Sequence, residues 1–171
     1  MAAKRKTYLL VDGYNIIFAW DELNKIAQDS LSDARDKLIF MLQNFVGYRD
    51  YEVILVFDAH KTNGTGSYTK AENITVVYTM EAVTADEYIE KTVAMLNKRD
   101  RIFVATSDAL EQVIIMALGA QRLSATDLFG MVDATNKRIT EEIGRKPVKK
   151  NQLIDILDEE AAKLFEELRL K

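Results

Sequence analysis

Short apolar runs alternate along the chain with longer segments whose apolar residues recur at helical spacing. The runs predict strands near residues 7–12, 53–58, 74–79 and 102–106, with a further short strand near 120–123. The first two are almost unbroken apolar runs, as is typical of strands that are covered on both faces. Strands that alternate with helices favour a parallel arrangement. The pattern therefore predicts an α/β fold, a three-layer sandwich with a central, mainly parallel sheet.

Helices are predicted in the segments between these strands. Residues 32–47 place apolar side chains along one helix face. Thr84 and Glu87 have the spacing of a capping box, which marks the start of the next helix. Asp108 and Glu111 repeat this spacing ahead of a third helix. Each of these helices would connect one strand to the next.

The remaining segments are assigned from turn residues and polarity. A helix is expected from residue 124 to about 142, and an amphipathic helix at about 151–169. The polar segment 59–72 is expected to be a loop, which serves either as a lid or substrate guide or as a surface connection without a role. The length of 171 residues is most simply that of one domain, 1–171.

The composition excludes several kinds of site. The chain has no Cys and a single His, His60, so disulfides, thiolate metal sites and multi-histidine metal sites within one chain are ruled out. No apolar stretch approaches the roughly 20 residues that span a bilayer. The basic start of the chain is not followed by the pattern of a signal peptide. We therefore expect a cytoplasmic protein with no membrane partner.

The net charge of −4 argues weakly against nucleic-acid binding, but the charges are unevenly distributed. Residues 137–150 are rich in Lys and Arg, whereas the segment after Asn151 is acidic. A basic surface can therefore coexist with an acidic total, although solvated helix faces explain both charge runs equally well. The candidate contacts to RNA phosphates are Arg122, Lys137, Arg138, Arg145, Lys146, Lys149 and Lys150.

Four acidic residues are placed where a parallel sheet gathers side chains. Asp12, Asp58 and Asp108 each follow a predicted strand, and Asp86 opens a predicted helix. Ligands of open parallel sheets bind beyond the carboxyl ends of the strands. Carboxylates that meet there raise one another's pKa unless a cation offsets their charge, and Mg²⁺ and Mn²⁺ prefer oxygen ligands. The acids therefore indicate metal-dependent cleavage of nucleic acid.

Each acid also has a structural interpretation. Asp12 and Asp108 are suitable N-cap residues, and Asp86 lies in a first helical turn, where an acid balances the helix dipole. A capping carboxylate keeps a second oxygen, so capping and metal binding do not exclude each other. Residues that could support the site by contacting an acid, a metal-bound water or a phosphate are Asn15, Asp58, Thr106, Ser107 and Glu90.

Aromatic residues and missing motifs narrow the interpretation further. Tyr14, Trp20 and Tyr68 are candidates for stacking on bases, although packing is the better interpretation of Trp20. There is no GxGxxG and no GxxxxGK[ST], so no nucleotide cofactor is expected. Asp12 also lacks the second Asp, two positions later, that aspartyl-phosphate phosphatases require. A phosphatase acting on small phosphoesters is therefore only a third interpretation.

Four segments resemble the motifs of a known family. The stretch Leu9–Ile17, LLVDGYNII, closely resembles the opening motif of NYN-domain proteins, a branch of the PIN-like nucleases. The segments Val56–His60, Thr84–Glu87 and Ala105–Asp108 resemble later motifs of the bacterial YacP-type subfamily. Their order and spacing also fit, and four motifs in this order are highly specific.

This resemblance implies a PIN-like fold and a Mg²⁺- or Mn²⁺-dependent endoribonuclease that cleaves single-stranded RNA. It implies that Asp12, Asp86 and Asp108 are the catalytic, metal-binding acids, with Asn15 and Asp58 in support. The activity recognised in this subfamily is cleavage of mRNA in the ribosomal A site, so mRNA and the ribosome are the expected partners. The alternative is a non-catalytic ribosome- or RNA-binding module whose acids only cap helices.

Overall fold

The computed structural model describes residues 4–59, 66–96 and 98–145. The chain divides into two compact units, Met1–Lys137 and Arg138–Lys171. The first unit contains a complete sheet with helices on both of its faces, and it also contains every residue of the candidate site described below.

A six-stranded sheet forms the centre of the first unit. Its strands span Thr7–Asp12 (β1), Glu52–Phe57 (β2), Ser67–Ala71 (β3), Ile74–Tyr78 (β4), Arg101–Ala105 (β5) and Gln121–Leu123 (β6). In space the strands follow the order β3-β4-β2-β1-β5-β6. Neighbouring strands pair in parallel, except that β3 runs antiparallel to β4 at one edge. The crossovers between the parallel strands leave room for helices on both faces.

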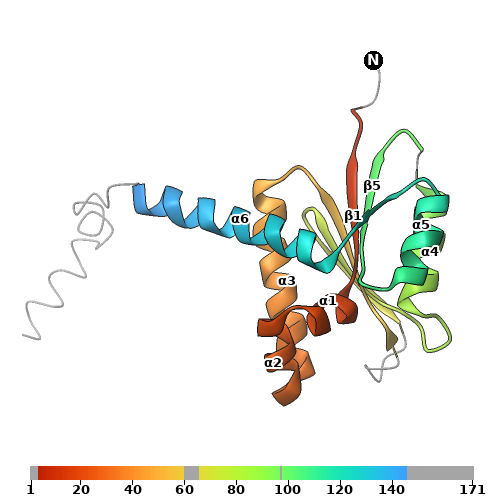
Figure 1. The fold of residues 1–171 in the computed structure, drawn as a ribbon, viewed down its shortest axis with the longest axis horizontal. Helices are drawn as coiled ribbons and strands as arrows, with labels where there is room; N and C mark the ends of the chain where they lie inside the picture. Colours follow the sequence, from red (N-terminus) through yellow and green to blue (C-terminus); the bar gives the residue numbers. More distant parts are fainter. Residues whose placement is uncertain (1–3, 60–65, 97, 146–171) are drawn as a thin grey trace, which may run out of the picture. The chain divides into compact units, whose positions relative to one another are not determined.

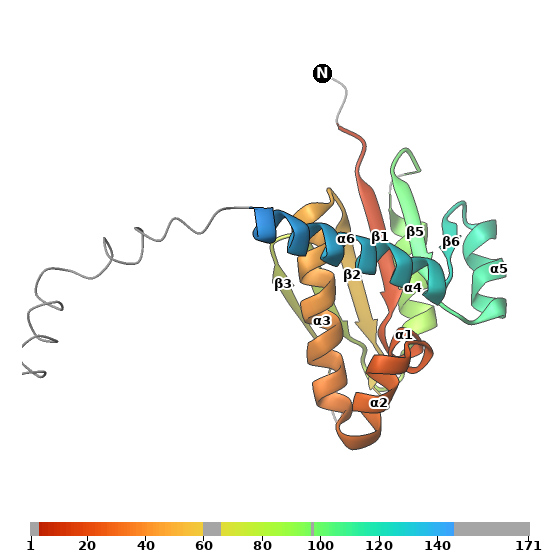
Figure 2. The ribbon, with the colours of Figure 1, turned by 60° about the vertical axis from the view of Figure 1, so that its left-hand side comes forward.

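Three helices and the start of a fourth cover one face of the sheet (Figures 1 and 2). Their bounds are Gly13–Ala19 (α1), Asp21–Asp29 (α2), Leu31–Tyr48 (α3) and Ala125–Arg145 (α6), and α6 belongs to the first unit as far as Lys137. Leu38 and Phe45 of α3 and Leu128 of α6 are fully buried in a cluster with residues of β1 and β2. The apolar stripe that predicted α3 is thus the face that meets the sheet.

Two helices, Ala85–Met95 (α4) and Ala109–Ala117 (α5), cover the opposite face (Figure 1). Ile89 of α4 and Ile115 of α5 are fully buried in one cluster with Leu10 and Val104 of the central strands. Because successive strand residues point to opposite faces, the unbroken apolar run of β1 supplies side chains to both layers. The three-layer α/β sandwich with a mainly parallel sheet is confirmed.

The sheet places the carboxyl ends of β1, β2 and β5 beside one another. Asp12, at the end of β1, is in register with Val56 of β2, and Val11 is in register with Ala105 of β5. Gly13 follows at once, and a Cβ atom on it would lie 2.3 Å from Cε1 of Phe57. A residue without a side chain is therefore needed for α1 to begin this close to β2.

Three elements were not predicted from the sequence. Residues 13–29, to which no element was assigned, form α1 and α2, and part of the expected loop 59–72 forms β3. α1 has seven residues, too few to show a helical period. β3 is exposed along its whole length and is rich in polar residues, so it lacks the apolar run that marks a buried strand. Residues 60–65 of the same segment lie outside the described residues.

Two expectations concern parts of the chain that the structure does not test. The single domain over 1–171 stays a prediction, and the helix at about 151–169 lies outside the described residues. Among the helices that the structure describes, none is both long and apolar enough to cross a bilayer.

Candidate metal centre

Three carboxylates from different elements converge at the carboxyl edge of the sheet. Asp12 ends β1, Asp86 lies in the first turn of α4, and Glu111 lies in the first turn of α5. Each contributes one carboxylate oxygen to a group in which all the oxygens lie within 4.8 Å of one another. We call Asp12, Asp86 and Glu111 the acidic triad.

Burial makes the acidic triad unfavourable when its members are all ionised. The side chain of Asp12 is 9% exposed and that of Glu111 is 2% exposed. Burial raises the pKa of Asp12 to about 7, and the nearby carboxylates of Asp86 and Asp58 contribute to this rise. Burial also raises the pKa of Glu111 to about 8, and Asp86 and Asp12 add to the effect. Such a site gains stability when a cation offsets the negative charge.

The donor set of the acidic triad fits a hard divalent cation. Both carboxylate oxygens of Glu111 are buried, yet neither accepts a hydrogen bond of ordinary geometry. Buried polar atoms are nearly always paired, and an ion is one way to satisfy them. The salt bridges within the described residues involve other carboxylates. Because its ligands are all oxygens, the triad suits Mg²⁺ or Mn²⁺.

Asp12 and Asp86 open onto a pocket of about 440 Å³, which we call the acidic pocket. Asp58 also lines it, together with the rings of Tyr14 and Phe18 from α1. The guanidinium of Arg35, on α3, donates a hydrogen bond to the Tyr14 hydroxyl at 3.0 Å. A positive charge therefore lies beside an otherwise acidic wall. Arg35 was not singled out in the sequence, because no helix was predicted for the segment that carries Tyr14 and the contact between α1 and α3 could not be foreseen.

The third member of the acidic triad differs from the predicted one. Asp108 is exposed, caps α5, and accepts a hydrogen bond from the Leu110 N–H at 2.9 Å. It is not part of the converging group, whereas Glu111 is, and the catalytic role of Asp108 stays a prediction. Glu111 turns into the protein instead of completing a capping box with Asp108. One signal was present, because Glu111 shares a helix face with the buried Ile115, and an acid on a buried face is unusual.

Asn15 connects the ends of two strands. Its side-chain oxygen accepts hydrogen bonds from the Ser107 N–H at 2.7 Å and from the Ser107 hydroxyl. Its backbone N–H, and not its side chain, donates to Oδ1 of Asp12, at 3.2 Å. The side chain of Asn15 therefore fixes the loop after β5 and does not contact Asp12 in the way that we expected.

Thr106 and Ser107 form this loop between β5 and α5. Thr106 is fully buried, and its hydroxyl oxygen accepts a hydrogen bond from the Asp108 N–H at 3.1 Å. Its carbonyl oxygen accepts another from the side-chain amide of Gln112 at 2.8 Å. Thr106 and Ser107 therefore position the start of α5, and with it Glu111. Their expected contact with a phosphate or a metal-bound water stays a prediction.

The other two supporting acids lie close to the acidic triad in the fold. Asp58 lines the acidic pocket and acts on Asp12 by raising its pKa. Glu90 is half-buried and follows Asp86 by one turn of α4. Neither residue belongs to the group of converging oxygens. A supporting role for both stays a prediction.

The candidate phosphate contacts have different surroundings. Arg122, on β6, is exposed and donates a hydrogen bond to the side-chain oxygen of Gln112 at 2.7 Å. Lys137 forms a salt bridge within α6. Arg138 and Arg145 are exposed residues of α6 that belong to the second unit. The predicted contacts outside the described residues are Lys146, Lys149 and Lys150.

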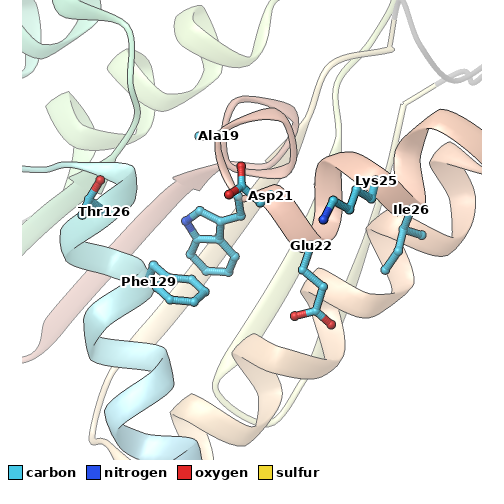
Figure 3. Close-up of a pocket in the computed structure, with 8 residues that line it drawn as sticks. Ala19, Asp21, Glu22, Lys25, Ile26, Thr126 and Phe129 are labelled. Carbon is cyan, nitrogen blue, oxygen red and sulfur yellow. The ribbon is translucent and has the colours of Figure 1, made fainter.

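Trp20 lines a different cavity, of about 770 Å³, whose walls come from α1, α2 and the start of α6 (Figure 3). Its indole N–H donates a hydrogen bond to the Ala125 carbonyl at 2.8 Å, and its ring packs edge-on against Phe129. Only 5% of Trp20 is exposed. No residue in the described part of the chain lines both this cavity and the acidic pocket. Packing therefore explains Trp20, as we expected from the sequence.

Known proteins resemble this chain over nearly its full length. The model of the YacP-like NYN domain family matches residues 9–170. YacP of Bacillus subtilis (strain 168) is 40% identical over 162 residues, which cover 94% of this chain and 95% of YacP. The crystal structure of Rae1 (YacP) from Bacillus subtilis has a TM-score of 0.73 at 38% identity, with 95% of this chain and 94% of that chain covered.

A crystal structure of the W164L mutant of Rae1 gives a similar result, with a TM-score of 0.72 at 39% identity and 84% of each chain covered. The family expected from the four sequence motifs is thus confirmed by both sequence and structure. NYN domains are generally nucleases, and the acidic triad is compatible with the divalent metal site of such an enzyme. The chain belongs to the YacP-like NYN domain family.

Proposed function

We propose that this protein is a divalent-metal-dependent endoribonuclease that cleaves single-stranded RNA. The substrate that we favour is mRNA in the ribosomal A site, which makes the ribosome a partner and the cytoplasm the site of action. Family membership supports the nuclease class. The observation that carries the proposal is the buried, unpaired carboxylate of Glu111, which lies against Asp12 and Asp86.

In this proposal, the acidic triad binds Mg²⁺ or Mn²⁺ through carboxylate oxygens. When bound, such an ion supplies an activated water and offsets the charge that develops on the phosphodiester. The protein fixes the ligands beforehand: Asp12 at the end of a strand, and Asp86 and Glu111 in the first turns of two helices. Preorganised ligands do not need to rearrange during the reaction.

The residues around the acidic triad have positioning roles in this proposal. The hydrogen bonds between Asn15 and Ser107 fix the β5–α5 loop, which keeps Glu111 facing Asp12. Arg35 orients the ring of Tyr14 at the wall of the acidic pocket and brings a positive charge close to the substrate phosphates. The exposed Arg and Lys residues add affinity that does not depend on RNA sequence.

A single strand fits this site better than a duplex. The acidic triad lies beyond the strand ends, and Asp12 and Glu111 are almost fully buried. An unpaired strand can bend so that one phosphate approaches these acids. A duplex must first be opened, at a cost of a few kcal/mol.

Cleavage assays on the full-length protein test this proposal. Free mRNA and actively translated mRNA are incubated with the protein in Mg²⁺, and again with EDTA. We expect cleavage that EDTA abolishes and that the variants Asp12→Asn and Asp86→Asn lose. The matched control is Asp36→Asn, which changes an exposed acid on α3 and should cleave as the wild type does. Full activity of both site variants in Mg²⁺ would overturn the proposal.

The same experiment separates the enzyme from a binding module. If the wild-type protein co-sediments with ribosomes but cleaves neither substrate, a non-catalytic ribosome- or RNA-binding role is the better conclusion. If only the translated message is cleaved, the endoribonuclease proposal stands and the ribosome is required to present the substrate.

A further inference from the structure

A second, smaller pocket lies at the edge of the sheet where the carboxyl end of β4 is found, and three tyrosines are among its lining residues. This pocket has a volume of about 270 Å³ and is lined by Tyr68 of β3, Tyr78 of β4 and Tyr88 of α4, with Met80 and Val83 between them in sequence. Among the residues that the structure describes, none that lines it is charged. We call it the tyrosine pocket.

The tyrosine pocket and the acidic pocket are adjacent in the fold. Asp86 lines the acidic pocket and Tyr88, two residues further along α4, lines the tyrosine pocket. Thr79, directly after β4, lines the tyrosine pocket and its hydroxyl oxygen accepts a hydrogen bond from the Ala59 N–H at 3.0 Å. Its own N–H donates to the Phe57 carbonyl at 3.0 Å, so the end of β4 is tied to the segment that carries Asp58.

The sheet order gives the distance between the strand ends that lie near the two pockets. β4 is two strands away from β1, and strands lie about 4.8 Å apart, so the end of β4 lies roughly 10 Å from the end of β1. A short stretch of extended RNA spans such a distance. One strand can therefore place a phosphodiester at the acidic triad and a neighbouring base at the tyrosine pocket.

A series of aromatic contacts joins the end of β4 to the start of α1, beneath the strand ends. Tyr78 stacks on Phe57, with ring centroids 5.4 Å apart and an interplanar angle of 22°. Phe57 contacts Tyr14 at 5.1 Å, and Tyr14 stacks with Phe18 at 6.4 Å. These rings pack in the layer of α1 and α3 and hold the end of β4 against the start of α1. Tyr68 is in register with Val77, so the rings of Tyr68 and Tyr88 lie on the other face of the sheet from the ring of Tyr78.

Large apolar groups at the mouth of the tyrosine pocket are exposed to solvent. Tyr68 is 76% exposed and Met80 is 62% exposed. Gly66 has a φ of +74°, and a Cβ atom on it would lie 2.6 Å from Cγ of Met80. The glycine therefore lets Met80 close one wall of the pocket. A flat apolar ligand that covered Met80 and the rings of Tyr68 and Tyr88 would remove this surface from water.

We propose that the tyrosine pocket binds one nucleobase of the RNA whose phosphodiester lies at the acidic triad. This assignment rests on the proposed ribonuclease function. Every base has a π-face that stacks on aromatic rings, and such stacking tolerates different base identities. The volume is below the roughly 300–1,000 Å³ of pockets that enclose drug-sized ligands, so it suits a single ring system. Uncharged walls favour a base over a phosphate.

Binding measurements on the full-length protein test the tyrosine pocket separately from cleavage. The probes are short, fluorescently labelled single-stranded oligoribonucleotides in EDTA, either intact or with one abasic nucleotide placed at each position in turn. The variants are Tyr68→Ala, Tyr88→Leu and the double variant, with the ring-preserving Tyr68→Phe and Tyr88→Phe. The matched control is Tyr48→Ala, which removes a partly exposed tyrosine from the end of α3.

We expect the double variant to bind the intact RNA roughly 5- to 150-fold more weakly, which corresponds to the stacking energy of one base. In the wild type, one abasic position should weaken binding by a similar factor, and the double variant should be insensitive to that substitution. The Phe variants should bind as the wild type does, because the ring and not the hydroxyl makes the contact.

Two outcomes would overturn the assignment. One is unchanged binding in the double variant, or no binding of the intact RNA by the wild type. The other is an abasic effect of equal size in wild type and double variant. Failure of the proposed function looks different: RNA would bind with the tyrosine and abasic effects intact, but Mg²⁺ would not bring about cleavage.

Discussion

The Asn15 side-chain oxygen accepts hydrogen bonds from both the backbone N–H and the hydroxyl of Ser107. This contact joins the start of α1 to the loop between β5 and α5, across 92 residues of sequence. Two members of the acidic triad are attached to these elements, Asp12 to the first and Glu111 to the second. The convergence of their carboxylates therefore depends on a polar contact made by a residue that cannot ionise.

Removing either partner of this contact should have graded effects. Asn15→Ala loses the acceptor for both hydrogen bonds, so we expect a free energy of unfolding about 1–2 kcal/mol lower and a clear loss of cleavage. Ser107→Ala loses only the hydroxyl contact, so we expect its free energy of unfolding to be about 0.5–1 kcal/mol lower than that of the wild type. Urea unfolding and cleavage in Mg²⁺ measure these effects. A Ser107→Ala variant that is affected more strongly than Asn15→Ala would contradict this account.

The exchange of Asp108 for Glu111 in the acidic triad leads to a second prediction. Glu111→Gln should reduce metal-dependent cleavage by more than about 100-fold. Residues that only orient the metal ligands typically cost roughly 10- to 100-fold when they are changed. Asp108→Asn should cleave nearly as the wild type does, because Asn also caps helices well.

Metal titration of the same two variants provides an independent check. A metal at 100 times its Kd stabilises the folded state by about 2.7 kcal/mol. Mg²⁺ or Mn²⁺ should therefore raise the Tm of wild type and Asp108→Asn but not that of Glu111→Gln. If Asp108→Asn loses the metal effect and Glu111→Gln keeps it, the assignment from the sequence was correct and the one from the geometry is wrong.

The raised pKa values of Asp12 and Glu111 predict that the metal-free protein is less stable at high pH. In the folded state their pKa values are about 7 and about 8, against ordinary values of 3.8 and 4.5. Between these limits the folded state binds more protons than the unfolded state, so the free energy of unfolding falls as pH rises. The stability that the two protonated carboxyls contribute is fully present below about pH 4 and is lost by about pH 8.

Urea unfolding in EDTA across this pH range measures the effect. In Glu111→Gln the glutamine cannot ionise, so the free energy of unfolding of this variant should depend less on pH. Near pH 8 it should exceed that of the wild type by on the order of 1–3 kcal/mol. Saturating Mg²⁺ should raise the free energy of unfolding of the wild type to a value close to that of Glu111→Gln. A metal-free wild type whose stability rises from pH 5 to pH 8 would show that these carboxylates are not buried together.

Two members of the acidic triad, Asp12 and Asp86, could be singled out from the sequence, and the third, Glu111, could not. Asp12 ends an apolar run, and parallel strands bring such ends to one edge whatever the details of packing. Asp86 was recognised because the capping box of Thr84 and Glu87 fixed the start of α4. Both inferences use local patterns, and the family resemblance implied the same two acids together with Asp108.

Glu111 depends on a rotation that local patterns do not specify. Its three-residue spacing from Asp108 is that of a capping box, and only the packing of Ile115 on the sheet turns Glu111 towards Asp12. Similarly, β3 is defined by pairing with β4 and not by its own composition. Tyr68 was singled out in the sequence, but its placement beside Tyr78 and Tyr88 depends on that pairing.

Gly13 provides a final prediction, because the start of α1 has no space for a side chain. Gly13→Ala would place a Cβ atom 2.3 Å from Cε1 of Phe57, a fully buried ring that cannot move away easily. We expect a free energy of unfolding about 1–3 kcal/mol lower, as for other overpacked cores. Because Asp12 precedes Gly13 directly, the shift of α1 should also weaken the Mg²⁺-dependent rise in Tm.

The matched control for this prediction is Gly130→Ala, in the part of α6 that belongs to the first unit. A Cβ atom there would meet nothing within 4 Å, and Ala is favoured over Gly inside a helix by up to about 1 kcal/mol. This variant should therefore be slightly more stable than the wild type and bind metal normally. Equal stability of the two Gly variants in urea unfolding would mean that Phe57 does not pack against the start of α1, and the fixed position of Asp12 would lose its structural basis.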